Sequence, residues 1–167
     1  MSKIEVNEIA ARSGTNIAMT SGHTIQPNFH SSTTFPAGHV IQVVQSDFTG
    51  TTETSTSTSY ANTSLAVTIT PTSTNSKILI TSTFLGQTTS DAYYDLKRGS
   101  TNLGGTNGFM RIELSGDAFP IGINLLDEPS TTSATTYTIA MRIASSGTVY
   151  MVGSPYKSTI QALEISG

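Results

Sequence analysis

The chain has 167 residues, a formal net charge of −3, only 11% charged residues and no cysteine. The lack of cysteine excludes disulfide bonds, thiolate metal sites and a cysteine nucleophile, and the negative charge gives no electrostatic basis for binding nucleic acid through its phosphates. Thr and Ser make up roughly a third of the residues and supply most of the polarity. With 36% apolar residues, this composition predicts a folded, Thr-rich β protein and argues against a disordered chain.

Residues 1–36 are predicted to form an extended N-terminal docking arm. Their apolar residues are spaced too widely to close a core, and glycines and prolines favour an extended path after residues 5–12, which have the composition of one or two helical turns. Ile4, Val6 and Ile9 are the predicted docking residues, which would be buried only against another protein. The segment has no long apolar run, so we expect no signal peptide, no membrane span and synthesis in a cytoplasm.

Residues 37–167 are predicted to form one β-sandwich domain, after a hinge at residues 34–38. Apolar residues there alternate with polar ones or cluster in short runs bounded by turn residues, which is typical of many short strands. About eight strands in roughly 130 residues are expected of an all-β, antiparallel, jelly-roll-like sandwich. The predicted strands are residues 39–45, 64–71, 77–86, 93–99, 109–115, 118–127, 135–144, 148–153 and 158–165.

Two early segments carry predictions about burial. Residues 39–45, HVIQVVQ, are predicted to be a buried strand. The run TTETSTSTSY at residues 51–60 is predicted to lead into the next strand, with Tyr60 as its first buried side chain. A flexible linker is the alternative for this run, because nothing within it forces strand pairing.

Later segments carry predictions about turns and faces. Asn107-Gly108 favours a turn with positive φ, which predicts a hairpin with a long tip between residues 93–99 and 109–115. Alternation assigns an inward face to three of the strands. The predicted inward residues are Leu65, Val67, Ile69, Ile78, Ile80, Ser82, Phe84, Tyr137, Ile139, Met141 and Ile143.

The domain resembles a group of virion structural proteins of tailed phages, especially phages of marine bacteria and cyanobacteria, described as tail-fibre-like or capsid-associated. The resemblance covers residues 35–167 and lies in strand patterns, without active-site motifs. It is carried by FPAGHVIQVVQ (35–45), the Thr/Ser run before SLAVTITPTSTNSKILI (64–80), YYDLKRGSTNLGG (93–105), TTYTIAMRIASSGTVYM (135–151) and STIQALEI (158–165).

The N-terminal run KIEVNEIAARSGTNI looks like the start of many phage fibre chains, in which a short segment docks to the particle. The resemblance implies a homotrimeric jelly-roll knob, similar to those of complement-C1q-like and fibre-head proteins. It implies a non-enzymatic capsid decoration or short fibre protein, located in the virion and bound to capsid or tail proteins. The alternative function is a carbohydrate-binding module of a tail fibre that recognises a host-surface glycan.

Tyr93, Tyr94 and Asn107 are the candidate residues for contact with such a glycan. Tyrosine rings offer stacking surfaces to sugars and asparagine offers hydrogen bonds, and the loops at residues 86–95 and 99–108 would present them. The alternative is that these aromatic residues pack at the rim of the sandwich or at a subunit interface. Tyr150, Tyr156, Asp91 and Asn102 are further neighbours considered for this surface.

No set of residues has a recognised catalytic spacing. The sequence has no G-x-S-x-G or S-x-x-K motif and no histidine after His39. Neither Asp91 with Asp95 nor Asp127 with Glu128 can be assigned the separation that glycoside hydrolysis requires. We therefore expect no enzymatic activity, no catalytic residue and no cofactor.

Metal binding is expected only in two weak forms, and no metal site is predicted. His23 and His30 would form a three-ligand site if each met its copies on a trimer axis. Asp91, Asp95 and Asp117 have the side chains that calcium prefers but lack the spacing of a recognised calcium loop. Solvated loop residues and turn caps are the default interpretation of all five.

Overall fold

The computed structural model describes residues 36–113 and 116–167, and the chain divides into two units between residues 34 and 35. All regular secondary structure in the described residues is β-strand, so no helix there has the length and apolar character to cross a membrane. The strands are β1 (Val40–Phe48), β2 (Glu53–Ser55), β3 (Ala61–Ile69), β4 (Lys77–Thr88), β5 (Ala92–Arg98), β6 (Thr101–Asn102), β7 (Met110–Ile112), β8 (Ala118–Asp127), β9 (Thr135–Ile143), β10 (Val149–Val152) and β11 (Ser158–Ile165).

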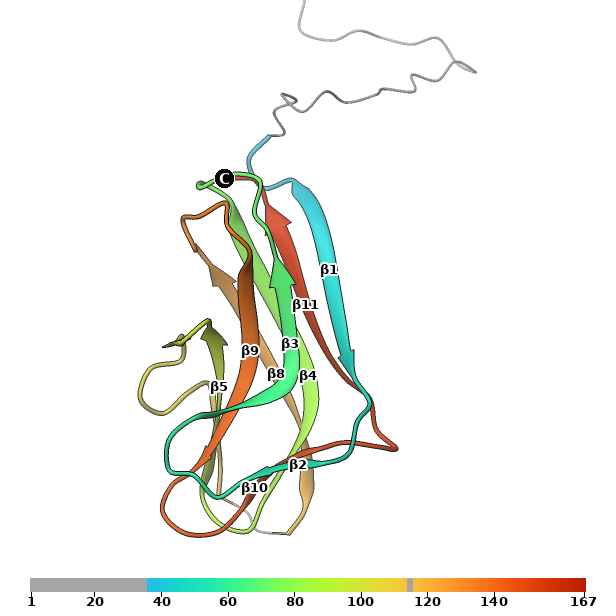
Figure 1. Ribbon diagram of the computed structural model, residues 1–167, viewed down its shortest axis with the longest axis vertical. Helices are drawn as coiled ribbons and strands as arrows, with labels where there is room; N and C mark the ends of the chain where they lie inside the picture. Colours follow the sequence, from blue (N-terminus) through green and yellow to red (C-terminus); the bar gives the residue numbers. More distant parts are fainter. Residues whose placement is uncertain (1–35, 114–115) are drawn as a thin grey trace, which may run out of the picture. The chain divides into compact units, whose positions relative to one another are not determined.

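The strands form two antiparallel sheets that pack face to face (Figure 1). In the first sheet β4 is central: β8 lies along one edge, and β11 and then β10 lie along the other. Beyond these, β1 pairs with β11 and β2 pairs with β10. The second sheet has the order β3-β9-β5, with β6 and β7 both paired to the outer edge of β5.

The order of pairing is that of a jelly roll, and the predicted all-β antiparallel sandwich is confirmed. Leaving aside the short strands β2, β6 and β10, the first strand pairs with the last, the second with the seventh, the third with the sixth and the fourth with the fifth. These four strand pairs form one long antiparallel ribbon. Two further pairings, β11 with β4 and β9 with β5, fold the ribbon into the two sheets. Such a double-sheet jelly roll is one of the architectures expected of antiparallel all-β chains.

The core lies between the sheets and is built mainly by residues that alternate along the strands. All of the predicted inward residues are buried, with Ser82 as the one polar member. Its hydroxyl donates to the Thr159 carbonyl at 2.9 Å, which satisfies it in an apolar setting. Phe84 and Tyr94, one from each sheet, meet at the centre with ring centroids 5.4 Å apart.

The prediction that the strand at residues 39–45 is buried is wrong. β1 is an edge strand of the first sheet, because among the described strands it pairs only with β11. Val43 is 58% exposed and Val40 is 45% exposed, while Val44 and Phe48 pack against the core. The apolar residues on both faces of this strand suggested full burial, but only the face toward the core is covered within one chain.

Residues 51–60 cross from one sheet to the other and are not a linker. They contain β2, which pairs with β10, and the Ser57 carbonyl accepts a hydrogen bond from the Ile143 N–H at 2.9 Å. β3 begins at Ala61, so the segment leads into a strand as predicted. Tyr60 is half-buried, although its hydroxyl oxygen is fully buried.

The predicted hairpin with a long tip is present. β5 pairs with β7 in the register Ala92 to Ile112 and Tyr94 to Met110, and Gly108 has the expected positive φ of 65°. We call residues 99–109 the tip loop. It contains β6, a two-residue strand that the sequence did not indicate.

The domain begins and ends at the same place. The Gly38 N–H donates to the Ser166 carbonyl at 2.7 Å, and the Ser166 N–H donates to the His39 carbonyl at 2.8 Å. Figure 1 shows the C-terminus beside the start of β1. The start of β1 and the end of β11 therefore lie at the same end of the domain.

Candidate functional site

The predicted docking residues Ile4, Val6 and Ile9 lie outside the described residues, as do His23 and His30. Docking through the N-terminal segment therefore stays a prediction. The glycan candidates Tyr93, Tyr94 and Asn107 are all among the described residues. The structure places Tyr94 in the core and the other two at the surface.

Tyr94 is wrong as a glycan-contact residue, because its side chain is 0% exposed. Its hydroxyl donates to the Tyr150 carbonyl at 2.5 Å and accepts from the Gln87 N–H at 3.1 Å. Burial, which outweighs these hydrogen bonds, raises the pKa of the Tyr94 hydroxyl. Tyr94 is thus a core residue that joins the two sheets.

Tyr93 and Asn107 reach the surface on the outward side of the second sheet. Tyr93 stands next to Arg111 on β7 and next to Arg142 on β9, because the register places these three residues opposite one another. The Arg142 guanidinium lies 4.0 Å from the centroid of the Tyr93 ring and 5.2 Å from that of the Tyr60 ring. The Arg111 guanidinium lies 5.9 Å from the Tyr93 centroid. We call these four residues the Arg–Tyr row.

The arginines of the described chain differ in their partners. Arg98 donates to both oxygens of Asp127, at 2.9 and 2.8 Å. Arg111 forms ion pairs at 2.7 Å with both Asp91 and Glu113. Arg142 has no carboxylate partner within the described residues, and its one hydrogen bond goes to the Thr106 carbonyl in the tip loop at 3.2 Å.

Asp95 holds the tip loop against the sheet. It is 0% exposed, and its Oδ1 accepts from the backbone N–H groups of Leu96 and Gly104, both at 2.8 Å. Burial raises the pKa of the Asp95 carboxyl, against the opposing effect of these N–H donors. Asp95 Oδ2 and the Tyr60 hydroxyl are buried with no hydrogen-bond partner among the described residues. Burial raises the pKa of Tyr60, the nearby Arg142 guanidinium opposes this, and the charge of Asp95 adds to the rise.

The proposed calcium ligands are not brought together. Asp91 is paired with Arg111, Asp95 is enclosed under the tip loop, and Asp117 is exposed on the connection before β8. Within residues 36–113 and 116–167 no group of three His, Asp or Glu side chains could hold a metal ion.

Two other ionisable clusters link strands. Glu164 is 0% exposed and accepts from the Thr72 N–H and hydroxyl, the Ser76 hydroxyl and the Gln42 amide, at 2.6 to 2.7 Å. Asp127 on β8 accepts from Arg98 on β5 and, at 2.6 Å, from the Tyr137 hydroxyl on β9, which ties the first sheet to the second. In both clusters the carboxylate is held by hydrogen bonds from within the domain.

The outward face of the first sheet carries an apolar row that the sequence analysis did not identify. The register places Val43, Leu163, Leu79 and Leu126 side by side across β1, β11, β4 and β8. Val43 is 58% exposed and Leu126 is 51% exposed. Beside this apolar row lies a row of polar uncharged residues, Gln45, Gln161, Thr81 and Asn124.

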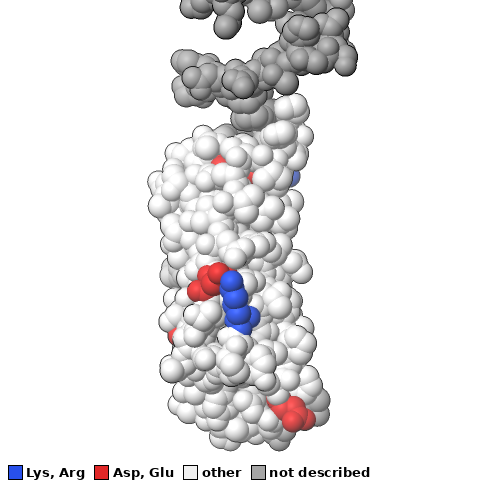
Figure 2. All heavy atoms as spheres, turned by 90° about the vertical axis from the view of Figure 1, so that its right-hand side faces the viewer, with Lys and Arg blue, Asp and Glu red and all other residues white. Residues whose placement is uncertain are grey.

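Two ion pairs border these rows: Lys77 with Glu128 at 3.0 Å, two residues from Leu79 and Leu126, and Lys157 with Asp47 at 2.8 Å near the end of β1. Figure 2 shows the side of the domain on which β1 lies, where most of the surface is uncharged, one acidic group adjoins one basic group and a further acidic group lies toward the lower end. A surface with apolar and amide groups and few charges has the composition of a protein–protein contact.

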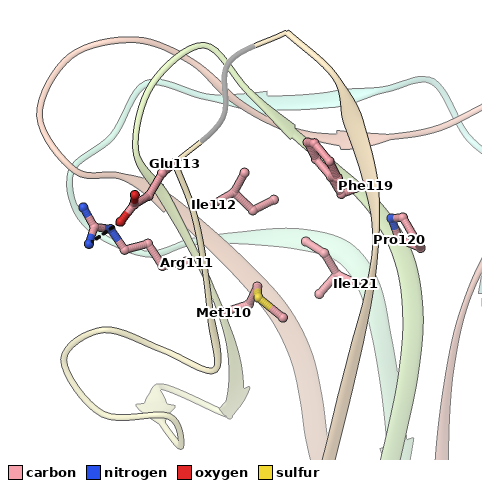
Figure 3. Close-up of a pocket in the computed structure, with 7 residues that line it drawn as sticks. All are labelled: Met110, Arg111, Ile112, Glu113, Phe119, Pro120 and Ile121. Carbon is pink, nitrogen blue, oxygen red and sulfur yellow. Dashed lines mark ion pairs between the residues drawn. The ribbon is translucent and has the colours of Figure 1, made fainter.

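A cleft of about 400 Å³ opens between β7 and β8, at the free edges of the two sheets. Figure 3 shows Ile112 and Ile121 pointing toward each other across it, while Arg111 and Glu113 pair on the outside. The remaining lining residues are Met110, Phe119 and Pro120. The cleft is apolar and contains none of the residues predicted to contact a glycan.

No protein-family model matches this chain, and no curated protein matches its sequence.

Proposed function

We propose that this chain is a non-enzymatic structural protein of a bacteriophage virion, a capsid decoration or short fibre protein that assembles as a homotrimer. In this proposal the N-terminal residues, with Ile4, Val6 and Ile9, dock the trimer to capsid or tail proteins. The observation that carries it is the exposed apolar row on the outward face of the first sheet. The trimeric state itself comes from the resemblance to fibre-knob proteins.

The apolar row favours a contact between copies of the chain. Val43 and Leu126 lie at its two ends, each more than half exposed, and full burial of one such side chain is worth about 1.5–3 kcal/mol. The polar row beside it has amide side chains that can form hydrogen bonds to another copy; within one chain, Gln161 donates to Gln45 at 2.6 Å. With only 11% charged residues in the chain, identical faces approach without strong mutual repulsion.

The position of the domain ends suits docking. Residues 36–40 and the C-terminus lie together at one end of the domain, and this is where the proposed docking segment joins it. Three docking segments on one trimer would act together, so modest affinity per chain gives durable attachment.

Removal of residues 1–12 tests the docking part of the proposal. The shortened protein should keep its folded domain, seen as an unchanged circular-dichroism spectrum and melting temperature, and should no longer co-purify with virus particles. The control is Ile9→Val, which keeps an apolar docking residue and should still join particles. Incorporation of the shortened chain at the level of the full chain would contradict docking by this segment.

The second candidate function is recognition of a host-surface carbohydrate by the same protein. The Arg–Tyr row favours it, because it places an aromatic ring and a guanidinium without a carboxylate partner beside the exposed polar residues Thr106 and Asn107. Binding of the full chain to host-derived polysaccharide that Tyr93→Ala abolishes would support this function. Absence of binding to any host polysaccharide would count against it.

A further inference from the structure

Among the residues that the structure describes, Arg142 has no carboxylate partner, although acidic residues outnumber basic ones in this chain, 11 to 8. Arg98 and Arg111 are each paired with aspartate. An unpaired guanidinium is thus a specific property of this position within the described residues, and it cannot be attributed to a shortage of acids.

Two aromatic rings and one hydrogen bond fix the position of the Arg142 guanidinium, and no carboxylate of the described residues neutralises its charge. The Tyr93 and Tyr60 rings flank it at 4.0 and 5.2 Å, and one N–H donates to the Thr106 carbonyl at 3.2 Å. Arginine has five N–H donors in a planar fork, and the bond to Thr106 uses one of them. Because the rings already restrict the side chain, a ligand that pairs with the fork loses little additional conformational entropy on binding.

We infer that Arg142, flanked by Tyr60 and Tyr93, binds the carboxylate of an acidic sugar. This inference rests on the second proposed function and goes further by naming the ligand class and the recognising residue. A carboxylate accepts two parallel hydrogen bonds from a guanidinium, which gives both affinity and orientation. The exposed side chains of Thr106 and Asn107 lie in the tip loop beside it and offer donors and acceptors to sugar hydroxyls.

Arg142 supplies the positive charge that a carboxylate would meet in this row. Arg111 is already paired with two carboxylates, Asp91 and Glu113, and Asp95 is enclosed beneath the tip loop with a raised pKa caused by its burial. Arg142 is therefore the group in the row whose positive charge is not balanced by a direct partner.

The test compares acidic oligosaccharides with their own methyl esters on the full chain at pH 7. The probes are trigalacturonate, trimannuronate and sialyllactose, measured by isothermal titration calorimetry. At least one free acid should bind, and its methyl ester should bind about tenfold more weakly or worse, because the charge-assisted pair is lost. A third probe is a trisaccharide without carboxylates that carries a sulfate group. It should bind more weakly than the best carboxylate ligand.

Matched variants locate the site. Arg142→Gln and Arg142→Lys should each weaken binding of the free acid by about tenfold, since neither retains the planar charged fork. Lys157→Gln is the control, because it removes a positive charge that is paired with Asp47 and lies outside the row, and the affinity of this variant for the free acid should stay within about threefold of the wild type. Circular dichroism and thermal melting of each variant verify that it is folded.

The outcomes separate the inference from the function on which it rests. Binding of neutral or methyl-esterified sugars as strongly as the free acids, or binding unaffected by Arg142→Gln, would overturn the acidic-sugar site and leave carbohydrate recognition standing. No binding of any acidic, esterified, sulfated or host-derived carbohydrate would overturn both. The comparison of acid with ester on the unmodified chain stays decisive even where a variant fails to fold.

Discussion

Two adjacent tyrosines have opposite roles because successive residues of a strand face opposite ways. Tyr94 points into the core and is 0% exposed, whereas Tyr93 stands outside under Arg142. The pattern of β5 contained the signal that separates them, because Leu96 lies two residues after Tyr94 and is an evident core residue. The pairing of Tyr93 with Arg142 and Tyr60 had no such signal, since it depends on the register of strands distant in sequence.

Substitution of the two tyrosines should distinguish core from surface. Tyr94→Ala should lower the free energy of unfolding by about 3–5 kcal/mol, because it leaves a cavity between the sheets. Tyr93→Ala should lower it by no more than about 1 kcal/mol, the value of an exposed cation–π contact. Urea unfolding followed by circular dichroism measures both, and equal losses at the two positions would contradict the assignment.

Glu164 should make the domain sensitive to acid. Burial disfavours its charge, but the hydrogen bonds from Ser76, Gln42 and Thr72 more than offset burial and lower the pKa of the carboxyl below its ordinary value of 4.5. A carboxyl with a lowered folded pKa contributes stability above its unfolded pKa and loses it as the pH falls through the folded pKa. The contribution should therefore be complete at pH 7 and decline below about pH 4.5.

The substitution Glu164→Gln tests this. At pH 7 it should lower the free energy of unfolding by about 1–3 kcal/mol, because buried donors lose their charged acceptor, and the variant should lose less stability than the wild type between pH 5 and pH 3. Glu128→Gln is the control, since Glu128 is exposed and only pairs with Lys77. Urea unfolding at several pH values gives the comparison, and an unchanged pH dependence in Glu164→Gln would refute it.

At the scale of elements, the tip loop depends on a glycine that has no room for a side chain. Gly108 has a φ of 65°, and a Cβ there would collide with the Tyr94 carbonyl and lie 2.6 Å from the Tyr60 hydroxyl. Gly105 has a similar φ of 72° but nothing within 4 Å. Substitution of Gly105 therefore tests backbone strain alone, whereas substitution of Gly108 adds a steric collision.

Gly105→Ala should cost about 1–2 kcal/mol of stability through backbone strain alone, and Gly108→Ala should cost more. Gly108→Ala should also loosen the tip loop, which faster amide exchange at Gly104 and Leu103 would reveal by NMR. If the two variants were equally stable, the close packing of the loop over Asp95 and Tyr60 would be contradicted.

Strand positions were predictable because alternation with a period of two is a local signal. It placed the inward faces of β3, β4 and β9 correctly. The exposure of β1 was not predictable, because HVIQVVQ is apolar on both faces and sequence does not say whether the second face meets the same chain or another one. β6 and the Arg–Tyr row depend on how the tip loop folds back, which is a tertiary property.

At the scale of the whole molecule, the two outward faces differ in character. The face of the first sheet has an apolar row beside a polar uncharged one, which favours contact with further copies. The face of the second sheet has the Arg–Tyr row, in which Arg142 keeps free donors. In the proposed assembly the first face is covered by other copies and the second remains available to a ligand.

Charge introduced into the apolar row should prevent association. Val43→Asp places a carboxylate on a residue that is 58% exposed, so the single chain should fold normally, while burial of that carboxylate in a contact would be strongly unfavourable. Tyr156→Asp is the control, because Tyr156 is similarly exposed at 54% but lies on the loop before β11. The control should associate like the wild type.

The most direct test of the proposed assembly is the solution mass of the full chain, measured by size-exclusion chromatography with light scattering. The account predicts a single species of three times the chain mass of 17.6 kDa, which Val43→Asp reduces to one chain and Tyr156→Asp leaves unchanged. A wild-type chain that remains monomeric across the concentration range of the measurement would contradict it.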